Sequence, residues 1–154
     1  MKFMKLSLVA FAAFVFFGCS QKAPVVESDS SVDYLSQAEN SLQSVYFDFD
    51  KSNVRADQEV VVISNSQVLN TGPVQGHHIT VSGNCDEWGS DEYNYALGVK
   101  RAASVAKQMV QNGVSPERIS LLSFGESAPI CTEHTKECWA QNRRSDIYIL
   151  PLIR

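Results

Sequence analysis

The sequence has little positive charge. Its 154 residues include 13 Lys and Arg against 17 Asp and Glu, which gives a formal net charge of −4. Proteins that bind nucleic acids or anionic lipid surfaces through electrostatic attraction present an excess of Lys and Arg. The deficit therefore argues against a nucleic-acid-binding protein and against a basic face for anionic lipid.

The sequence also lacks an apolar run long enough to cross a bilayer as a mature helix. Residues 6–17 are mainly apolar, about a dozen residues where a spanning helix needs about 20. Lys2 and Lys5 precede this run and Gly18 follows it. A charged start, a short apolar segment and a small residue at the cut are typical of a secretory signal peptide. Residues 1–18 are predicted to be removed, which leaves 11 basic residues against 17 acidic ones, a net charge of −6.

Cys19 directly follows the predicted cleavage site, and this step resembles a bacterial lipobox. In a lipobox the cysteine is acylated and becomes the new N-terminus. Phe16 and Phe17 depart from the usual Leu and small residue, so ordinary cleavage or a retained anchor stay as alternatives. The lipobox resemblance implies lipidation at Cys19, and Ser20, in place of the Asp that often marks inner-membrane retention, favours the outer membrane.

Residues 20–44 contain Pro24 and a mixture of Ser, Asp and Val without a clear period. This composition predicts a mostly disordered segment, with one or two helical turns over 35–42 as its only structure. Residues 19–44 are therefore expected to be a lipidated N-terminus and flexible tether. Residues 45–154 are expected to be the folded domain.

Within 45–154 the apolar patterns alternate between the two periods of regular structure. Strands are predicted at 45–50, 78–83, 118–124 and 145–150, and helices at 56–69 and 92–112 with a short one within 131–141. Asn112-Gly113 is a helix stop, and Asp91 and Glu92 suit a helix start. The order β-α-β-α-β-(α)-β predicts an α+β sandwich, with one mixed four-stranded sheet and helices on one face.

A loop between the second strand and the long helix carries the main candidate site. Asp86 lies just past the strand, where open α/β sheets bind ligands. Asn94 and Arg101 share one helical stripe whose later members are apolar. A carboxylate, an amide and a guanidinium together suit a ligand with an ammonium and a carboxylate on one carbon. An Asp86–Arg101 salt bridge that only closes the loop is the alternative.

The predicted secretion of the domain decides how its cysteines are interpreted. A secreted domain meets oxidising conditions, so Cys131 and Cys138, seven residues apart, are predicted to form a disulfide. A Cys₃His metal site with Cys85 and His134 is the rival, although the spacing matches no recognised zinc motif. Cys85 is otherwise a buried small apolar residue, with a reactive thiol as the less favoured alternative.

The central stretch resembles the OmpA-like peptidoglycan-binding domain, whose signature is Asn-x-x-Leu-Ser-x-x-Arg-Ala. The matching positions are Asn94, Leu97, Gly98, Arg101 and Ala102, with Gly98 in place of Ser. The lead-in resembles the peptidoglycan-associated lipoprotein branch, although Asn84-Cys85 stand where that branch commonly has His-Thr. Further matches lie at 45–51, 123–126, 129 and 142–144.

This resemblance implies a noncovalent binder of the meso-diaminopimelate in peptidoglycan stem peptides. Asp86 and Arg101 would hold its zwitterionic end with help from Asn94, and Leu97, Phe49, Asp50 and Arg143 would complete the pocket. It also implies a Tol–Pal-type system in which a TolB-like periplasmic propeller competes for the same surface. A motor or secretion anchor of another envelope complex is the alternative. No cofactor is implied, and an enzyme is improbable because no nucleophile–base pair or phosphate loop is present.

Overall fold

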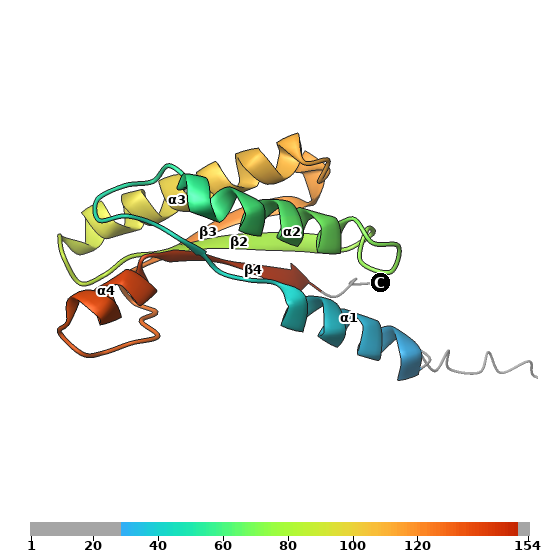
Figure 1. Cartoon of the computed structure of the whole chain (residues 1–154), viewed down its shortest axis with the longest axis horizontal. Helices are drawn as coiled ribbons and strands as arrows, with labels where there is room; N and C mark the ends of the chain where they lie inside the picture. The colour runs from blue at the N-terminus through green and yellow to red at the C-terminus, as the bar shows by residue number, and fades with distance from the viewer. Residues whose placement is uncertain (1–28, 151–154) are drawn as a thin grey trace, which may run out of the picture.

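The computed structural model describes residues 29–150 (Figure 1). The predicted signal peptide and Cys19 lie outside these residues. Within them the chain forms four α-helices and one mixed four-stranded sheet, in the strand order β1-β4-β2-β3. The helices are α1 (Asp29–Ser41), α2 (Glu59–Leu69), α3 (Asp91–Gln111) and α4 (Lys136–Asn142). The strands are β1 (Val45–Tyr46), β2 (His78–Asn84), β3 (Ile119–Gly125) and β4 (Arg144–Leu150). The α+β prediction is confirmed.

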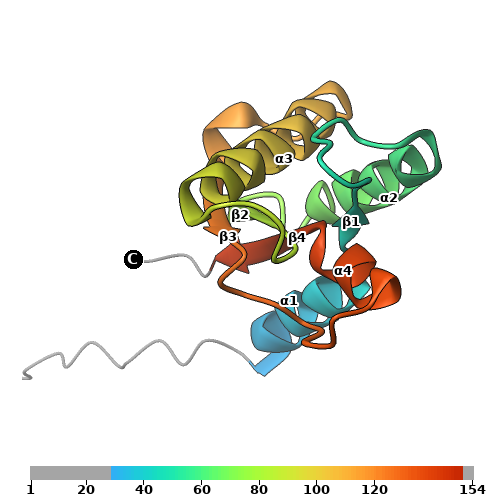
Figure 2. The ribbon, with the colours of Figure 1, turned by 90° about the vertical axis from the view of Figure 1, so that its left-hand side faces the viewer.

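The sheet is mixed because β2 runs parallel to β3 and antiparallel to β4. Helices α2 and α3 cover one face of the sheet, as predicted. Helices α1 and α4 lie on the opposite side of the sheet, next to β4 (Figures 1 and 2). Alternate side chains of the central strands, such as Ile79, Val81 and Ile147, point into the core under α2 and α3. Val105 and Met109 of α3 meet them there, fully buried, so the apolar end of the α3 stripe is core, as the sequence indicated.

The ends of α3 follow from its sequence. Ser90 is the N-cap, and its hydroxyl accepts a hydrogen bond from the Tyr93 backbone N–H at 3.3 Å. At the other end Gly113 adopts a φ of 90°, which glycine reaches without steric penalty. No helix within residues 29–150 is long and apolar enough to span a membrane.

Helix α1 is the main departure from the sequence-based expectation. The segment before residue 45 was expected to be a mostly disordered tether, but residues 29–41 are helical and Ala38 is buried in the core. Leu35 and Leu42 pack against the same core. The buried amide of Asn65 then holds the chain, because it exchanges two hydrogen bonds with the Gln43 backbone at 2.9 and 2.7 Å. These contacts are tertiary, which is why the local pattern did not reveal them.

The first strand is shorter than expected. Residues 45–50 alternate, but only Val45 and Tyr46 pair with β4. Phe47 still donates its N–H to Arg143 O at 2.9 Å, and beyond it the chain turns. Lys51 N–H bonds to Asp48 O at 3.2 Å, and Asp50 within this turn has a φ of 56°. The turn brings Phe49 and Asp50 to the end of the sheet where β2 stops.

Candidate functional site

Three loops meet at the C-terminal end of β2, the end that faces the viewer in Figure 2. They are the turn after β1, the β2–α3 loop that carries Asp86, and the segment around α4. A cavity of about 320 Å³ opens between the first two. Its lining residues are Phe49, Asp50, Asp86, Trp88, Gly89, Tyr93 and Leu97. Four of the predicted site residues (Phe49, Asp50, Asp86 and Leu97) therefore do share one cavity.

Asp86 is the buried carboxylate of this cavity, with the residue only 4% exposed. Its Oδ2 accepts a hydrogen bond from Arg143 NH1 at 3.0 Å. Arg143 is anchored in turn, because its Nε donates to Phe47 O at 3.2 Å. Among the described residues, none donates to Asp86 Oδ1. One carboxylate oxygen is thus fixed by an arginine and the other is available to a donor in the cavity.

Arg101 forms no hydrogen bond or ion pair with Asp86 within residues 29–150, although the Asp86 charge is close enough to act on it. The residue is fully buried and its guanidinium lies beneath the turn after β1. Nε donates to Lys51 O at 2.9 Å, NH1 to Asn84 O at 2.8 Å, and NH2 to Asp48 O at 3.3 Å. The alternative Asp86–Arg101 ion pair is not found either, since the carboxylate of Asp86 pairs with Arg143. Arg101 thus holds the cavity wall in place.

The Arg101 guanidinium is a buried charge with neutral hydrogen-bond partners. Three backbone carbonyls and the Cys85 sulfur, 3.4 Å away, accept its hydrogen bonds, and its carbon lies 5.2 Å from the centre of the Phe47 ring. Burial lowers the pKa of Arg101, but a guanidinium stays protonated in proteins. Arg101 and Arg143 supply two positive charges close to the Asp86 and Asp50 carboxylates, so the site carries both signs of charge.

Asn94 is also buried, and it acts on the β2–α3 loop from below. Its Nδ2 donates to Asp86 O at 3.3 Å and makes a short hydrogen bond to Glu126 Oε2. Its buried Oδ1 accepts no hydrogen bond within residues 29–150. The predicted site residues thus divide into two layers. Asp86 and the loop residues line the cavity, and Asn94 and Arg101 support it.

Gly98 explains the one change in the signature. A Cβ there would lie 2.2 Å from Ser123 Oγ and 2.8 Å from Gly83 O, closer than real Cβ atoms approach. The facing Gly83 is equally constrained, because its Cβ would lie 1.9 Å from Gly98 O. Glycine at both positions lets α3 rest directly on β2, which brings Arg101 down to the end of that strand.

Tyr93 closes the cavity on the α3 side. Its hydroxyl makes a short hydrogen bond to the Asp50 carboxylate. This bond to an anion raises the pKa of Tyr93, because it favours the protonated phenol. The contact ties the turn after β1 to the first turn of α3.

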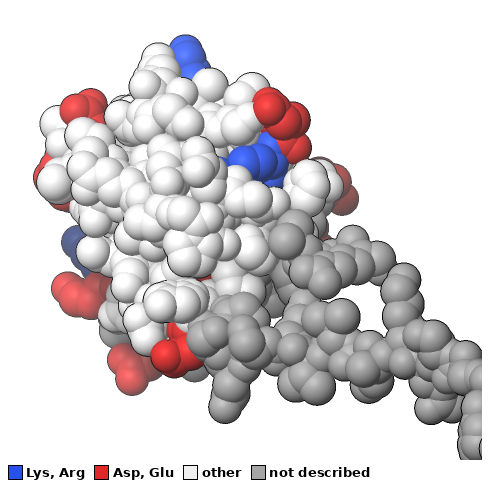
Figure 3. Space-filling view, turned by 90° about the vertical axis from the view of Figure 1, so that its right-hand side faces the viewer, with Lys and Arg blue, Asp and Glu red and all other residues white. Residues whose placement is uncertain are grey.

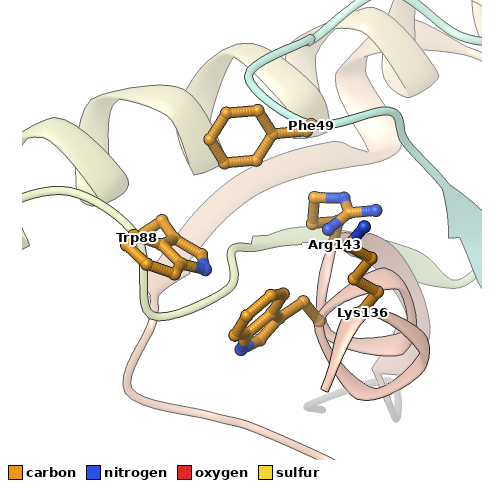
Figure 4. A pocket seen from close by; sticks show the side chains of 5 residues that line it. Phe49, Trp88, Lys136 and Arg143 are labelled. Atoms are coloured by element: carbon orange, nitrogen blue, oxygen red, sulfur yellow. The ribbon is translucent and has the colours of Figure 1, made fainter. Parts of the chain in front are cut away.

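A second cavity, of about 470 Å³, adjoins the first (Figure 4). Phe49 and Trp88 line both cavities, and Lys136, Trp139 and Arg143 complete the second. Lys136, Trp88 and Trp139 were not predicted as site residues. The signal that could have found them is the placement of the chain's only two tryptophans in or next to loops.

The disulfide prediction is confirmed, since Cys131 and Cys138 are bonded. Their pairing removes the Cys₃His alternative, because neither sulfur remains for a metal. The free Cys85 is buried, as expected for a small apolar residue, and burial raises the pKa of its thiol to about 11. A thiol with such a pKa stays protonated at neutral pH, which argues against a reactive nucleophile.

The comparisons with known proteins agree with this architecture. Residues 46–143 match the OmpA family. The chain belongs to the OmpA family. Over 96% of its length it is 32% identical to a peptidoglycan-associated lipoprotein of Pseudomonas putida, covering 97% of that protein. It is 31% identical to the protein of the same name from Pseudomonas aeruginosa, with the same coverage.

Solved structures of OmpA-like domains superpose on the chain. The peptidoglycan-associated lipoprotein from Burkholderia pseudomallei has a TM-score of 0.65 at 38% identity, over 70% of this chain and 90% of that one. The C-terminal domain of Helicobacter pylori MotB has the same TM-score at 24% identity, over 71% and 84%. The second likeness shows the fold alone. Membership of this family agrees with a binding module rather than an enzyme.

Proposed function

We propose that this OmpA-family chain is an outer-membrane lipoprotein that binds peptidoglycan noncovalently through the cavity at Asp86. The proposal depends above all on one observation, the buried Asp86 carboxylate that lines the cavity, with one oxygen held by Arg143 and no hydrogen bond to the other within residues 29–150. An ammonium group of the ligand would bind the open oxygen. The names of the Pseudomonas and Burkholderia relatives support peptidoglycan as the ligand.

The ligand group would be the free zwitterionic end of meso-diaminopimelate. Its ammonium suits Asp86, and its carboxylate suits the positive charges of Arg101 and Arg143 at the same end of the sheet. A buried charged site binds a zwitterion better than either ion alone, because each charge of the ligand compensates one of the site. In this arrangement Arg101 acts through its field and through the turn it holds, while Arg143 bonds directly to Asp86 and lines the adjoining cavity.

The deciding experiment is Asp86→Asn, assayed by co-sedimentation with purified sacculi. We expect affinity to fall at least about tenfold, because an amide does not attract an ammonium as a carboxylate does. Asp146→Asn is the matched control. Asp146 is a partly buried carboxylate paired with Arg144 at 2.9 Å, so it carries the same chemistry away from the cavity. Equal binding by wild type and Asp86→Asn would contradict the proposal.

We further propose that acylated Cys19 holds the chain in the outer membrane and that residues 20–28 and helix α1 connect the anchor to the domain. Mass spectrometry of the mature N-terminus would detect the acyl chains. Cys19→Ser should release the protein into the soluble periplasmic fraction. A Tol–Pal-type role predicts that a TolB-like propeller competes with peptidoglycan, whereas an anchor of a motor or secretion complex would bind another envelope partner.

A further inference from the structure

The second cavity has a rigid aromatic wall. The rings of Trp88 and Trp139 meet edge to face, with centroids 5.3 Å apart. Trp139 Nε1 donates to Glu87 Oε1 at 2.8 Å, and His134 Nδ1 bonds to the same oxygen at 2.7 Å. These hydrogen bonds lower the pKa of Glu87 and fix the indole. Phe49 closes the opposite side (Figure 4).

The remaining wall carries positive charge. Lys136 and Arg143 lie next to each other in Figure 4. Arg143 is neutralised by Asp86 at 3.0 Å, whereas Lys136 forms no ion pair with any residue of the described range 29–150. The Glu87 carboxylate is engaged by Trp139 and His134. The cavity thus offers aromatic surface and one ammonium without a partner.

We propose that this second cavity is a carboxylate subsite that binds the acidic residue preceding diaminopimelate in the same stem peptide. The inference rests on the proposed function and extends it. That residue is a D-glutamate linked through its side-chain carboxyl, so its α-carboxylate is free. The carboxylate pairs with Lys136, and the methylene groups pack on Trp88 and Trp139. Because the two cavities share Phe49 and Trp88, neighbouring residues of one peptide reach both.

The Lys136 ammonium and the aromatic wall favour a carboxylate over a cationic or a purely apolar ligand group. A cationic group would be repelled by Lys136, and a purely apolar group would leave the ammonium unused. Amidation of the α-carboxyl removes the charge and keeps the size, so the subsite distinguishes glutamate from isoglutamine. The chain would therefore discriminate between peptidoglycans whose glutamate is free and those whose glutamate is amidated.

The test is a cycle of two peptides and two proteins. The probes are L-Ala-γ-D-Glu-meso-diaminopimelate and its α-amide, titrated calorimetrically into the full soluble chain that begins after residue 19. Wild type should bind the amide about fivefold more weakly than the acid. Lys136→Met should lose about fivefold for the acid and show no preference between the peptides. Lys107→Met, an exposed lysine of α3, is the control and should keep the wild-type preference.

A second variant tests the aromatic wall. Trp88→Ala should weaken both peptides about tenfold and leave the preference for the acid intact. Equal binding of both peptides by wild type would overturn the subsite while leaving the proposed function standing. An equal loss of both peptides in Lys136→Met would also overturn it, since this would show only a general charge effect. If wild type binds neither peptide, both proposals fail.

Discussion

The two ends of strand β2 are built around the same device, a buried arginine whose partners are backbone carbonyls. At the N-terminal end Arg118 donates to His77 O at 2.8 Å, Val74 O at 2.9 Å and Leu69 O at 3.1 Å. At the C-terminal end Arg101 donates to carbonyls of residues 48, 51 and 84. Burial lowers the pKa of both arginines. Each guanidinium gathers separate loops onto one end of the sheet.

The ends differ in what surrounds the arginine. Arg101 lies at the end of the sheet where both cavities open, and the charges of Asp86 and Arg143 are close enough to act on it. Where the described residues are visible, the face at the opposite end is uncharged at its centre and carries charged side chains toward its rim (Figure 3). A buried arginine that binds carbonyls is thus a general way to close loops in this fold. The end of the sheet that we propose as the binding site differs by its buried carboxylate, Asp86.

Replacing the two arginines should give the largest effects. Arg101→Leu and Arg118→Leu each remove the hydrogen bonds of a buried guanidinium to three backbone carbonyls, so each should lose about 3–5 kcal/mol of unfolding free energy. Urea unfolding measures this loss. Only Arg101→Leu should also change the native tryptophan fluorescence, because Trp88 and Trp139 both lie at its end.

Binding to sacculi should distinguish Arg101→Leu from Arg118→Leu. With stability restored by a saturating osmolyte, Arg118→Leu should co-sediment with sacculi as wild type does, and Arg101→Leu should not. If both variants lost binding equally, the two ends would share the function and the comparison would be wrong.

The disulfide should give the next largest effect, and at the site end alone. Cys131→Ala with Cys138→Ala opens a small ring, which predicts a loss of about 2–3 kcal/mol in the chain-entropy view. The loop should stay in place, because Asn142 Nδ2 donates to Cys131 O at 2.7 Å and its Oδ1 accepts from the backbone of Ile130 and Cys131. Urea unfolding with and without reductant measures the loss. An unchanged midpoint would show that Asn142 alone holds α4.

The sequence predicts the elements of the domain because their patterns are local. The predicted helix at 92–112 differs from α3 by one residue at each end, and the predicted strand at 78–83 differs from β2 by one residue at its C-terminal end. Asp86 was found from its place after a strand. The orientation of Arg101 was missed because the carbonyls it binds belong to residues 48, 51 and 84, and no spacing along α3 reveals them. The full length of helix α1 was missed for the same reason, since only one or two helical turns over 35–42 were predicted.

The Cys85 thiol should make the site end sensitive to alkaline pH. Its pKa is raised from 9.0 to about 11, so the folded state keeps a proton that the unfolded state loses. Stability is therefore fully present below pH 9 and falls as pH rises toward 11, by up to about 2 kcal/mol. Cys85→Ala should flatten this decline in urea unfolding measured from pH 8 to 10.5. Parallel curves for wild type and variant would contradict the assignment.

The glycines give the smallest and most local contrast. Gly98→Ala adds a Cβ 2.2 Å from Ser123 Oγ, whereas a Cβ at Gly76, in the loop held by Arg118, meets nothing within 4 Å. We expect Gly98→Ala to lose about 1–2 kcal/mol, the overpacking being partly offset by better helix propensity, and Gly76→Ala to change little. Ser123→Gly should recover part of the loss, because it removes the nearest atom, while Gly83 O at 2.8 Å remains. Thermal unfolding of the three variants measures these changes in stability. A Gly98→Ala variant as stable as wild type would mean that α3 can move away from β2 without disturbing Arg101.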